Sequence, residues 1–72
     1  TLLFDKIILR VKELRGIHGH SQEQLKENTG LDIANLEAGE NFPSITSISI
    51  LCKFYNLTLD EFFAPMNYPP KE

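Results

Sequence analysis

The sequence predicts an all-α fold, a compact bundle of about five short helices. Two observations support this fold class. Apolar residues recur at helical spacing near the start of the chain and again after residue 44. Two capping boxes, each a hydroxyl residue followed three positions later by Gln or Glu, mark helix starts at Ser21 and Thr58. With 72 residues and an apolar fraction of 42%, the chain suits one domain with one small core.

The first helix is expected from about residue 3 to residue 15. Charged residues fill its outer face, so the helix is amphipathic. Gly16 and Gly19 then indicate a loop. The apolar residues that predict the inward face of this helix are Phe4, Ile7, Ile8, Val11 and Leu14.

The second helix is expected from about Gln22 to Asn28. Ser21 is its N-cap, and Leu25 is its inward residue. The sequence Asn-Thr-Gly that ends at Gly30 breaks this helix and indicates a tight turn.

The third helix follows this turn directly. Asp32 can cap it, Ile33 and Leu36 face inward, and Gly39 can end it in a left-handed conformation. Two short helices joined by a Gly-containing turn form a helix-turn-helix, which usually places its second helix in the major groove of DNA.

Two more helices are expected in the remainder of the chain. Ser44 and Thr58 are their N-caps, and Pro65 ends the last one. We therefore predict a helix-turn-helix domain over residues 1–64 and an extended C-terminal tail over residues 65–72. The expected inward residues are Ile45, Ile48, Leu51, Cys52 and Tyr55 in the fourth helix and Leu59, Phe62 and Phe63 in the fifth.

Four short motifs follow one another in the chain: S-Q-E-x-L, T-G-L, L-E-x-G and N-x-P-S. In this order they resemble the lambda-repressor-like (Xre-type) helix-turn-helix family over roughly residues 7–63. In the family about three more residues separate the turn Leu from the Glu of L-E-x-G, here Leu31 and Glu37. The recognition helix is thus about three residues shorter than usual, at the start where the family makes most of its base contacts. The matching residues are Ser21, Gln22, Glu23, Leu25, Gly30, Glu37, Gly39, Pro43 and Ser44.

The resemblance also implies roles for single residues. Arg15 is expected to pair with Glu37 and to tie the first helix to the third; the alternative is a solvated surface Arg15. The glutamine after the cap, here Gln22, donates to the DNA backbone in the family. Residues of the loop after the third helix, here Asn41 and its neighbours, contact the backbone beside the groove.

Further phosphate contacts are expected at the start of the second helix. The helix that begins after Ser21 offers unpaired N–H groups and the positive end of a helix dipole. Lys26 is the only cation in this unit and can contact a phosphate, or it can form an exposed ion pair with Glu23 or Glu27.

Three residues are candidates for reading bases. Asn35 is the best, since its amide both donates to and accepts from adenine; the alternative is a plain exposed helix residue. Asp32 can accept from cytosine, unless capping already occupies it. Thr29 can donate to a phosphate or contact a thymine methyl group.

The charge distribution argues for weak non-specific DNA affinity. The net charge is −3, with +2 in residues 1–15, −4 in residues 16–45 and −1 in residues 46–72. The acidic excess thus lies in the unit expected to face phosphates, whose neutralisation supplies most non-specific affinity.

Other classes of function lack a signal. His18 and His20 have no Cys or third ligand nearby, so no metal site is expected, and Cys52 is the only cysteine. No catalytic set or cofactor motif is visible, so we expect neither an enzyme nor a small-molecule substrate. No apolar run is long enough for a membrane span and no signal-peptide pattern occurs, which together predict a cytoplasmic protein.

The sequence therefore favours a sequence-specific module of a transcriptional regulator that binds double-stranded DNA. A homodimer would place two recognition helices roughly 34 Å apart on a pseudo-palindrome. Its expected contacts lie in the fifth helix and the tail, at Phe62, Phe63 and Tyr68. The alternative is a protein-interaction module that has lost DNA reading, which the acidic balance and the short recognition helix favour. A third interpretation is a part of a longer regulator or of a toxin–antitoxin pair.

Overall fold

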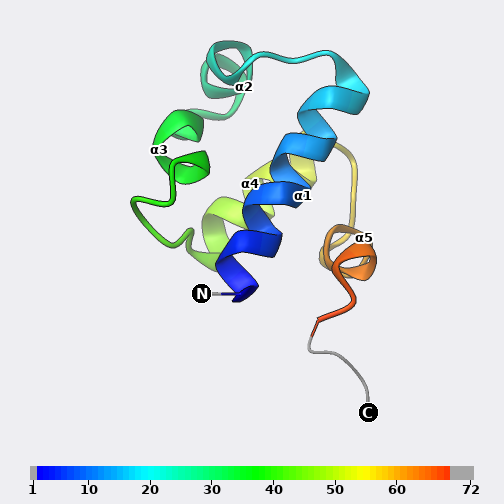
Figure 1. Ribbon diagram of the computed structural model, residues 1–72. Helices are drawn as coiled ribbons and strands as arrows, with labels where there is room; N and C mark the ends of the chain where they lie inside the picture. Colours follow the sequence, from blue (N-terminus) through cyan, green and yellow to red (C-terminus); the bar gives the residue numbers. More distant parts are fainter. Residues whose placement is uncertain (1, 69–72) are drawn as a thin grey trace.

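The computed structural model describes residues 2–68, and all the regular structure in that range is helical (Figure 1). The predicted all-α fold is confirmed. The elements are α1 (Leu2–His18), α2 (Gln22–Thr29), α3 (Ile33–Glu37), α4 (Ile45–Phe54), α5 (Leu59–Phe63) and the short 3-10 helix η1 (Ala64–Met66).

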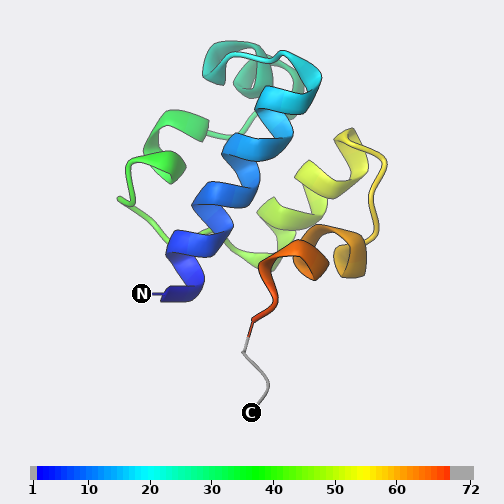
Figure 2. The ribbon, with the colours of Figure 1, turned by 45° about the vertical axis from the view of Figure 1, so that its right-hand side comes forward.

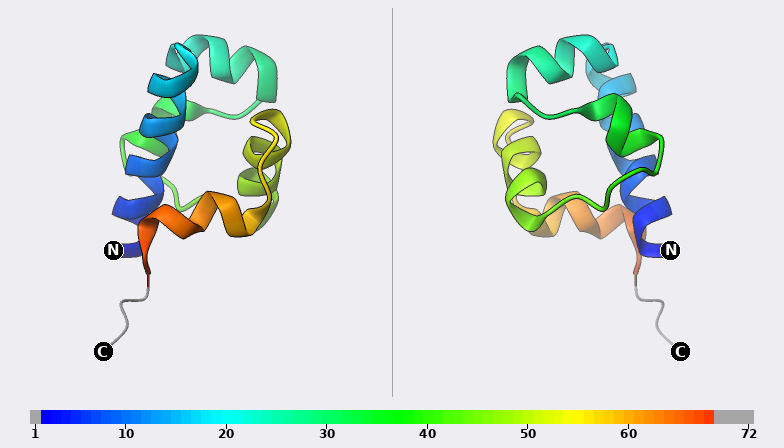
Figure 3. Two further views of the ribbon diagram at one scale, coloured as in Figure 1. Left: turned by 90° about the vertical axis from the view of Figure 1, so that its right-hand side faces the viewer. Right: turned by 90° about the vertical axis from the view of Figure 1, so that its left-hand side faces the viewer.

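The helices pack around one core. Figure 3 shows α2 at one end of the molecule and α5 at the other, with α1 and α4 on either side between them. Each of the six elements contributes at least one buried apolar side chain. The core consists of Ile7, Val11, Leu14, Leu25, Ile33, Leu36, Ile48, Leu51, Cys52, Tyr55, Phe62 and Met66.

The predicted helix starts are confirmed by their hydrogen bonds. The Ser21 hydroxyl accepts from the Gln24 backbone N–H (3.1 Å), and the Gln24 side chain accepts from the Ser21 N–H (2.8 Å). Thr58 and Glu61 form the same reciprocal pair at 3.0 and 2.9 Å. Asp32 and Ser44 also cap their helices. Gly30 leaves α2 with φ +75°, a left-handed conformation that glycine adopts without steric cost.

The first helix is longer than predicted. It continues through Gly16 to His18, and Gly19 leaves it with φ +68°. One glycine inside a helix costs only about 1 kcal/mol. The added turn is useful because it stacks the His18 ring on Tyr55, with ring centroids 4.6 Å apart. Tertiary packing thus outweighs the weak local signal to stop.

Two expected inward residues, Ile45 and Leu59, instead face solvent. Their side chains are 61% and 41% exposed. Both directly follow an N-cap and are the first residues of α4 and α5. At this position the side chain lies outside the stripe of the helix that reaches the core, so an apolar residue there does not face inward.

The predicted boundary between domain and tail also needs correction. Ala64, Pro65 and Met66 form η1, and Met66 is buried against the core. The Lys6 ammonium donates to the Met66 carbonyl at 3.2 Å, which holds η1 beside α1 (Figure 2). Pro65 fits because the first turn of a helix needs no N–H from it. Residues 69–72 of the predicted tail lie outside the described residues.

Phe62 is likewise not the surface residue that a dimer contact requires. Its ring is fully buried, and Arg10 on α1 covers it at 5.8 Å from the ring centroid. The Arg10 Nε atom also donates to the Phe62 carbonyl at 2.7 Å. This residue therefore belongs to the core of the single chain. Phe63 is half-buried and Tyr68 is 40% exposed.

Among residues 2–68, no helix combines the length and apolar character that a bilayer span needs. In the same part of the chain, no group of three or more potential metal ligands comes together.

Candidate nucleic-acid interface

The helix-turn-helix unit is formed by α2, α3 and the turn between them. The Gly30 N–H donates to the Lys26 carbonyl (2.7 Å) and closes α2. Leu25 and Ile33 are fully buried, so both helices are fixed to the core by their inward faces. The two helices are thereby held in a defined orientation relative to α1 (Figure 1).

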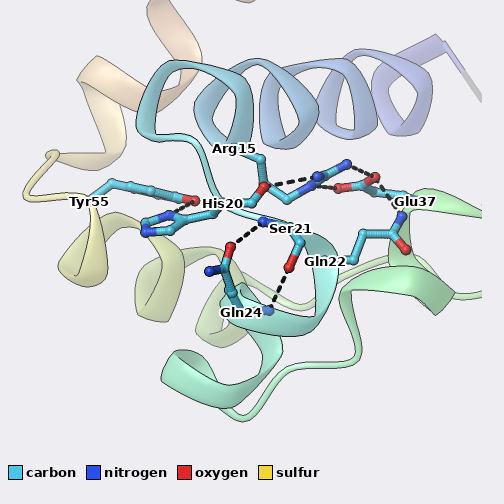
Figure 4. A network of polar contacts seen from close by, with 7 residues as sticks. All are labelled: Arg15, His20, Ser21, Gln22, Gln24, Glu37 and Tyr55. Atoms are coloured by element: carbon cyan, nitrogen blue, oxygen red, sulfur yellow. Dashed lines mark hydrogen bonds and ion pairs between the residues drawn. The ribbon is translucent and has the colours of Figure 1, made fainter.

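A polar network joins this unit to α1 (Figure 4). Arg15 donates to both carboxylate oxygens of Glu37, from Nε to Oε2 and from Nη2 to Oε1, each at 2.7 Å. Its Nη1 atom donates to the His20 carbonyl at 3.1 Å. The Gln22 side chain donates to Glu37 Oε1 at 2.9 Å. The expected Arg15–Glu37 ion pair is present, and it includes Gln22 as a third member.

The Glu37 carboxylate lies in an unusual setting for a charge. Only 2% of its side chain is exposed, against 19% for Arg15. Burial alone would raise the pKa of Glu37, but the hydrogen bonds from Arg15 and Gln22 outweigh burial and lower this pKa below its ordinary value. The hydrogen bond to Glu37 in turn raises the pKa of Arg15. The charged pair therefore persists near neutral pH.

Three of the four predicted phosphate-binding residues share one surface hollow at the start of α2. Gln22 is half-buried there, because its amide is held by Glu37. Two acidic side chains lie beside the same hollow, so its charge is mixed rather than basic. The lining residues are Arg15, Ser21, Gln22, Glu23, Lys26, Asp32 and Ala34.

A second hollow lies between α3 and the start of α4. It contains the fourth predicted phosphate residue, Asn41, together with the predicted base readers Asn35 and Asp32. The Asn41 side-chain nitrogen donates to the Asn35 side-chain oxygen at 2.9 Å. Asp32 accepts from the Asn35 backbone N–H at 3.0 Å as the cap of α3. Asp32 lines both hollows and connects them into one face.

Thr29 is not brought together with the other base-reading candidates. Its hydroxyl donates to the Leu25 carbonyl (2.7 Å) and accepts from the Leu31 N–H (3.3 Å), so it closes the turn. Thr29 lines a separate hollow with Ile50 and Phe54 of α4. Its place in the turn explains the difference, because the last residue of α2 points toward α4 rather than along α3.

His20 makes aromatic contacts that the sequence does not predict. Its Nδ1 atom lies 3.2 Å from the Tyr55 hydroxyl, and its ring is 5.5 Å from that of Phe54. Burial is the main cause that raises the pKa of Tyr55, and Glu37 adds to it. These contacts fix the chain just before the capping box of α2. No local signal predicts them, since 35 residues separate His20 from Tyr55.

Comparison with known proteins supports the helix-turn-helix assignment. The helix-turn-helix family model matches residues 11–62 of the chain, which cover α2 and α3 completely. The chain therefore belongs to this helix-turn-helix family, and the resemblance to lambda-repressor-like proteins is confirmed.

A named relative supports the same membership. The chain is 35% identical over 57 residues to the uncharacterized HTH-type transcriptional regulator YgzD of Bacillus subtilis (strain 168). The match spans 75% of this chain and 86% of that protein. No solved structure matches the chain.

Proposed function

We propose that this chain is the sequence-specific DNA-binding domain of a transcriptional regulator, with α3 in the major groove. The observation that carries the proposal is the continuous face formed by two hollows that Asp32 connects. On this face the start of α2 would meet phosphates, and Asn35 on α3 would meet base edges. The family membership and the regulator relative support the same function.

The network around Glu37 gives the face its rigidity. Gln22 keeps its remaining amide N–H for a phosphate after one N–H is spent on Glu37. Because Gln22 and Arg15 both donate to Glu37, hydrogen bonds join the start of α2 to the end of α3 and to α1. A fixed spacing between phosphate contacts and base contacts sets the register of a reader on the duplex.

The acidic side chains make this a weak binder of non-specific DNA. Glu23 and Asp32 line the first hollow, while Arg15 there is paired with Glu37. Lys26 is then the one cation in that hollow without a strong acidic partner among the described residues. Specific affinity would thus rest on hydrogen bonds and on a second copy of the domain.

The second copy would pair through the outer side of α5 and the residues that follow it. Leu59 and Tyr68 are 41% and 40% exposed, and Phe63 is half-buried. Phe62 takes no part because its ring is buried. A homodimer would place two α3 helices about one helical turn of DNA apart, roughly 34 Å.

One experiment tests the proposal directly. Fluorescence anisotropy with a randomised duplex pool at two salt concentrations would be followed by sequencing of the bound fraction. We expect a two-fold-symmetric site to be enriched and the affinity to fall as salt rises. Asn35→Ala should relax discrimination at one base by about 1–3 kcal/mol, whereas Ser49→Ala on the exposed side of α4 should leave it unchanged.

The second candidate function is a protein-interaction module on the same fold. The mixed charge of the first hollow favours it, because phosphates are repelled by Glu23 and Asp32. Absence of binding to any duplex at low salt would reject DNA reading and support this second function.

A further inference from the structure

A side-chain hydrogen bond joins Asn35 to Asn41 on the wall of the hollow between α3 and the start of α4. We propose that Asn41 is a positioning residue that turns the Asn35 amide so that its nitrogen faces the base, which makes guanine the preferred partner. This inference rests on the proposed function, since it names the base that Asn35 would read.

Asn41 is itself held firmly in the loop between α3 and α4. The preceding residue, Glu40, donates its backbone N–H to the Asn35 carbonyl at 3.2 Å. The next residue, Phe42, packs its ring on Phe4 with centroids 5.0 Å apart, and Pro43 is buried. The loop is thus anchored on both sides of Asn41.

The contact assigns different chemistry to the two ends of the Asn35 amide. Its oxygen accepts from the Asn41 nitrogen at 2.9 Å, in a hydrogen bond at the protein surface. Among residues 2–68, the Asn35 side-chain nitrogen has no protein acceptor, so its two N–H groups remain for a ligand. Asn35 is only half-buried and lines an open hollow, so a base edge can reach that nitrogen.

The bases differ in what they offer to such a donor. Adenine is read by asparagine through both ends of the amide, with the oxygen accepting from N6 and the nitrogen donating to N7. Guanine presents two neighbouring acceptors, N7 and O6, in the major groove. An Asn35 whose oxygen is already engaged by Asn41 therefore matches guanine better than adenine.

Two variants of Asn41 separate this role from a merely structural one. Asn41→Ala releases the Asn35 oxygen. The ratio of adenine to guanine at that position among the selected sequences should therefore rise by at least about fivefold. The carboxylate in Asn41→Asp can only accept hydrogen bonds. It should therefore accept from the Asn35 side-chain nitrogen and turn the Asn35 oxygen toward the base. The preferred base should then be one that donates, cytosine or adenine. Asn41 is exposed, and circular dichroism would verify that both variants fold.

The test is selection from a randomised duplex pool with the wild-type chain, both Asn41 variants and Asn35→Ala. Asn56→Asp, between α4 and α5, is the matched control for the added negative charge. With the wild type we expect a preference for guanine at one position per half-site. Asn35→Ala should abolish this preference. The Asn41 variants alone should replace it with a preference for another base.

The outcomes that overturn the inference are distinct from failure of the proposed function. A wild-type preference for cytosine at that position would mean that the Asn35 oxygen faces the base. Asn41 variants that weaken all sequences equally would make Asn41 a plain backbone contact. Either result overturns this inference alone. A wild-type chain that binds no duplex overturns the proposed function, and this inference with it.

Discussion

Arg15 and Glu37 hold α1 and α3 together through a two-point ion pair, although 22 residues separate them in the chain. The Glu37 carboxylate is almost completely buried, and Gln22 adds a third hydrogen bond to it. A charge in this position is tolerated only because every one of these donors is in place. The pair therefore supports both the core and the candidate interface.

Glu37→Gln should destabilise the domain by about 3 kcal/mol, because Arg15 loses its counter-charge in a partly buried position. Urea unfolding followed by circular dichroism at pH 7 measures this loss. Glu40→Gln is the matched control, since Glu40 is exposed and its change should stay within about 0.5 kcal/mol. Equal midpoints for the two variants would show that the pair contributes nothing to stability.

The same carboxylate predicts how stability depends on pH. The pKa of Glu37 is lowered by Arg15 and Gln22 when the chain is folded, whereas in the unfolded chain it lies near the ordinary value of about 4.3. The unfolded chain binds the proton first as pH falls. The stabilisation is therefore complete above about pH 4.3 and is lost as pH falls further through the folded pKa.

Unfolding experiments at a series of pH values between 7 and 3 test this dependence. The wild type should lose stability below about pH 4.3, and Glu37→Gln should lose less over the same range. Parallel curves for the two proteins would assign the acid sensitivity to other carboxylates.

Glu23→Gln should raise the affinity for DNA by roughly two- to threefold at low salt, since it removes one negative charge beside the hollow at the start of α2. Anisotropy with one defined duplex measures the change. Asp60→Asn makes the same charge change on α5, far from that hollow, and should leave affinity nearly unaltered. An equal gain in both variants would indicate that only the net charge matters.

Phe62 and Tyr68 should respond differently to truncation. Phe62→Ala should cost about 3–5 kcal/mol of folding free energy, because it leaves a cavity in the core. Tyr68→Ala should leave the stability of the single domain within about 0.5 kcal/mol and should weaken self-association. Denaturant unfolding and sedimentation equilibrium measure the two effects. Unchanged self-association in Tyr68→Ala would exclude this residue from the dimer surface.

The helix starts were predictable from the sequence because capping is a local interaction. Ser21 with Gln24, and Thr58 with Glu61, satisfy each other's backbone groups three residues apart. The order of the short motifs was also sufficient to recognise the family. These features depend on neighbours along the chain, so no tertiary structure is needed to read them.

The partners of the candidate site residues depended on contacts that spacing alone does not reveal. The Thr29 hydroxyl is hydrogen-bonded within the turn, and the Phe62 ring is buried in the core. The Asn35 side-chain oxygen accepts a hydrogen bond from Asn41, a residue beyond the end of its helix.

Sequence by itself thus determined the fold class and the helix starts, through hydrogen bonds between residues three or four apart. Only the tertiary structure decided which side chains remain available to a ligand. The physical reason is that tertiary packing brings a partner beside each donor, acceptor or apolar face. A group that already has such a partner is no longer available to a ligand. At His20 and Tyr55 that neighbour lies 35 residues away.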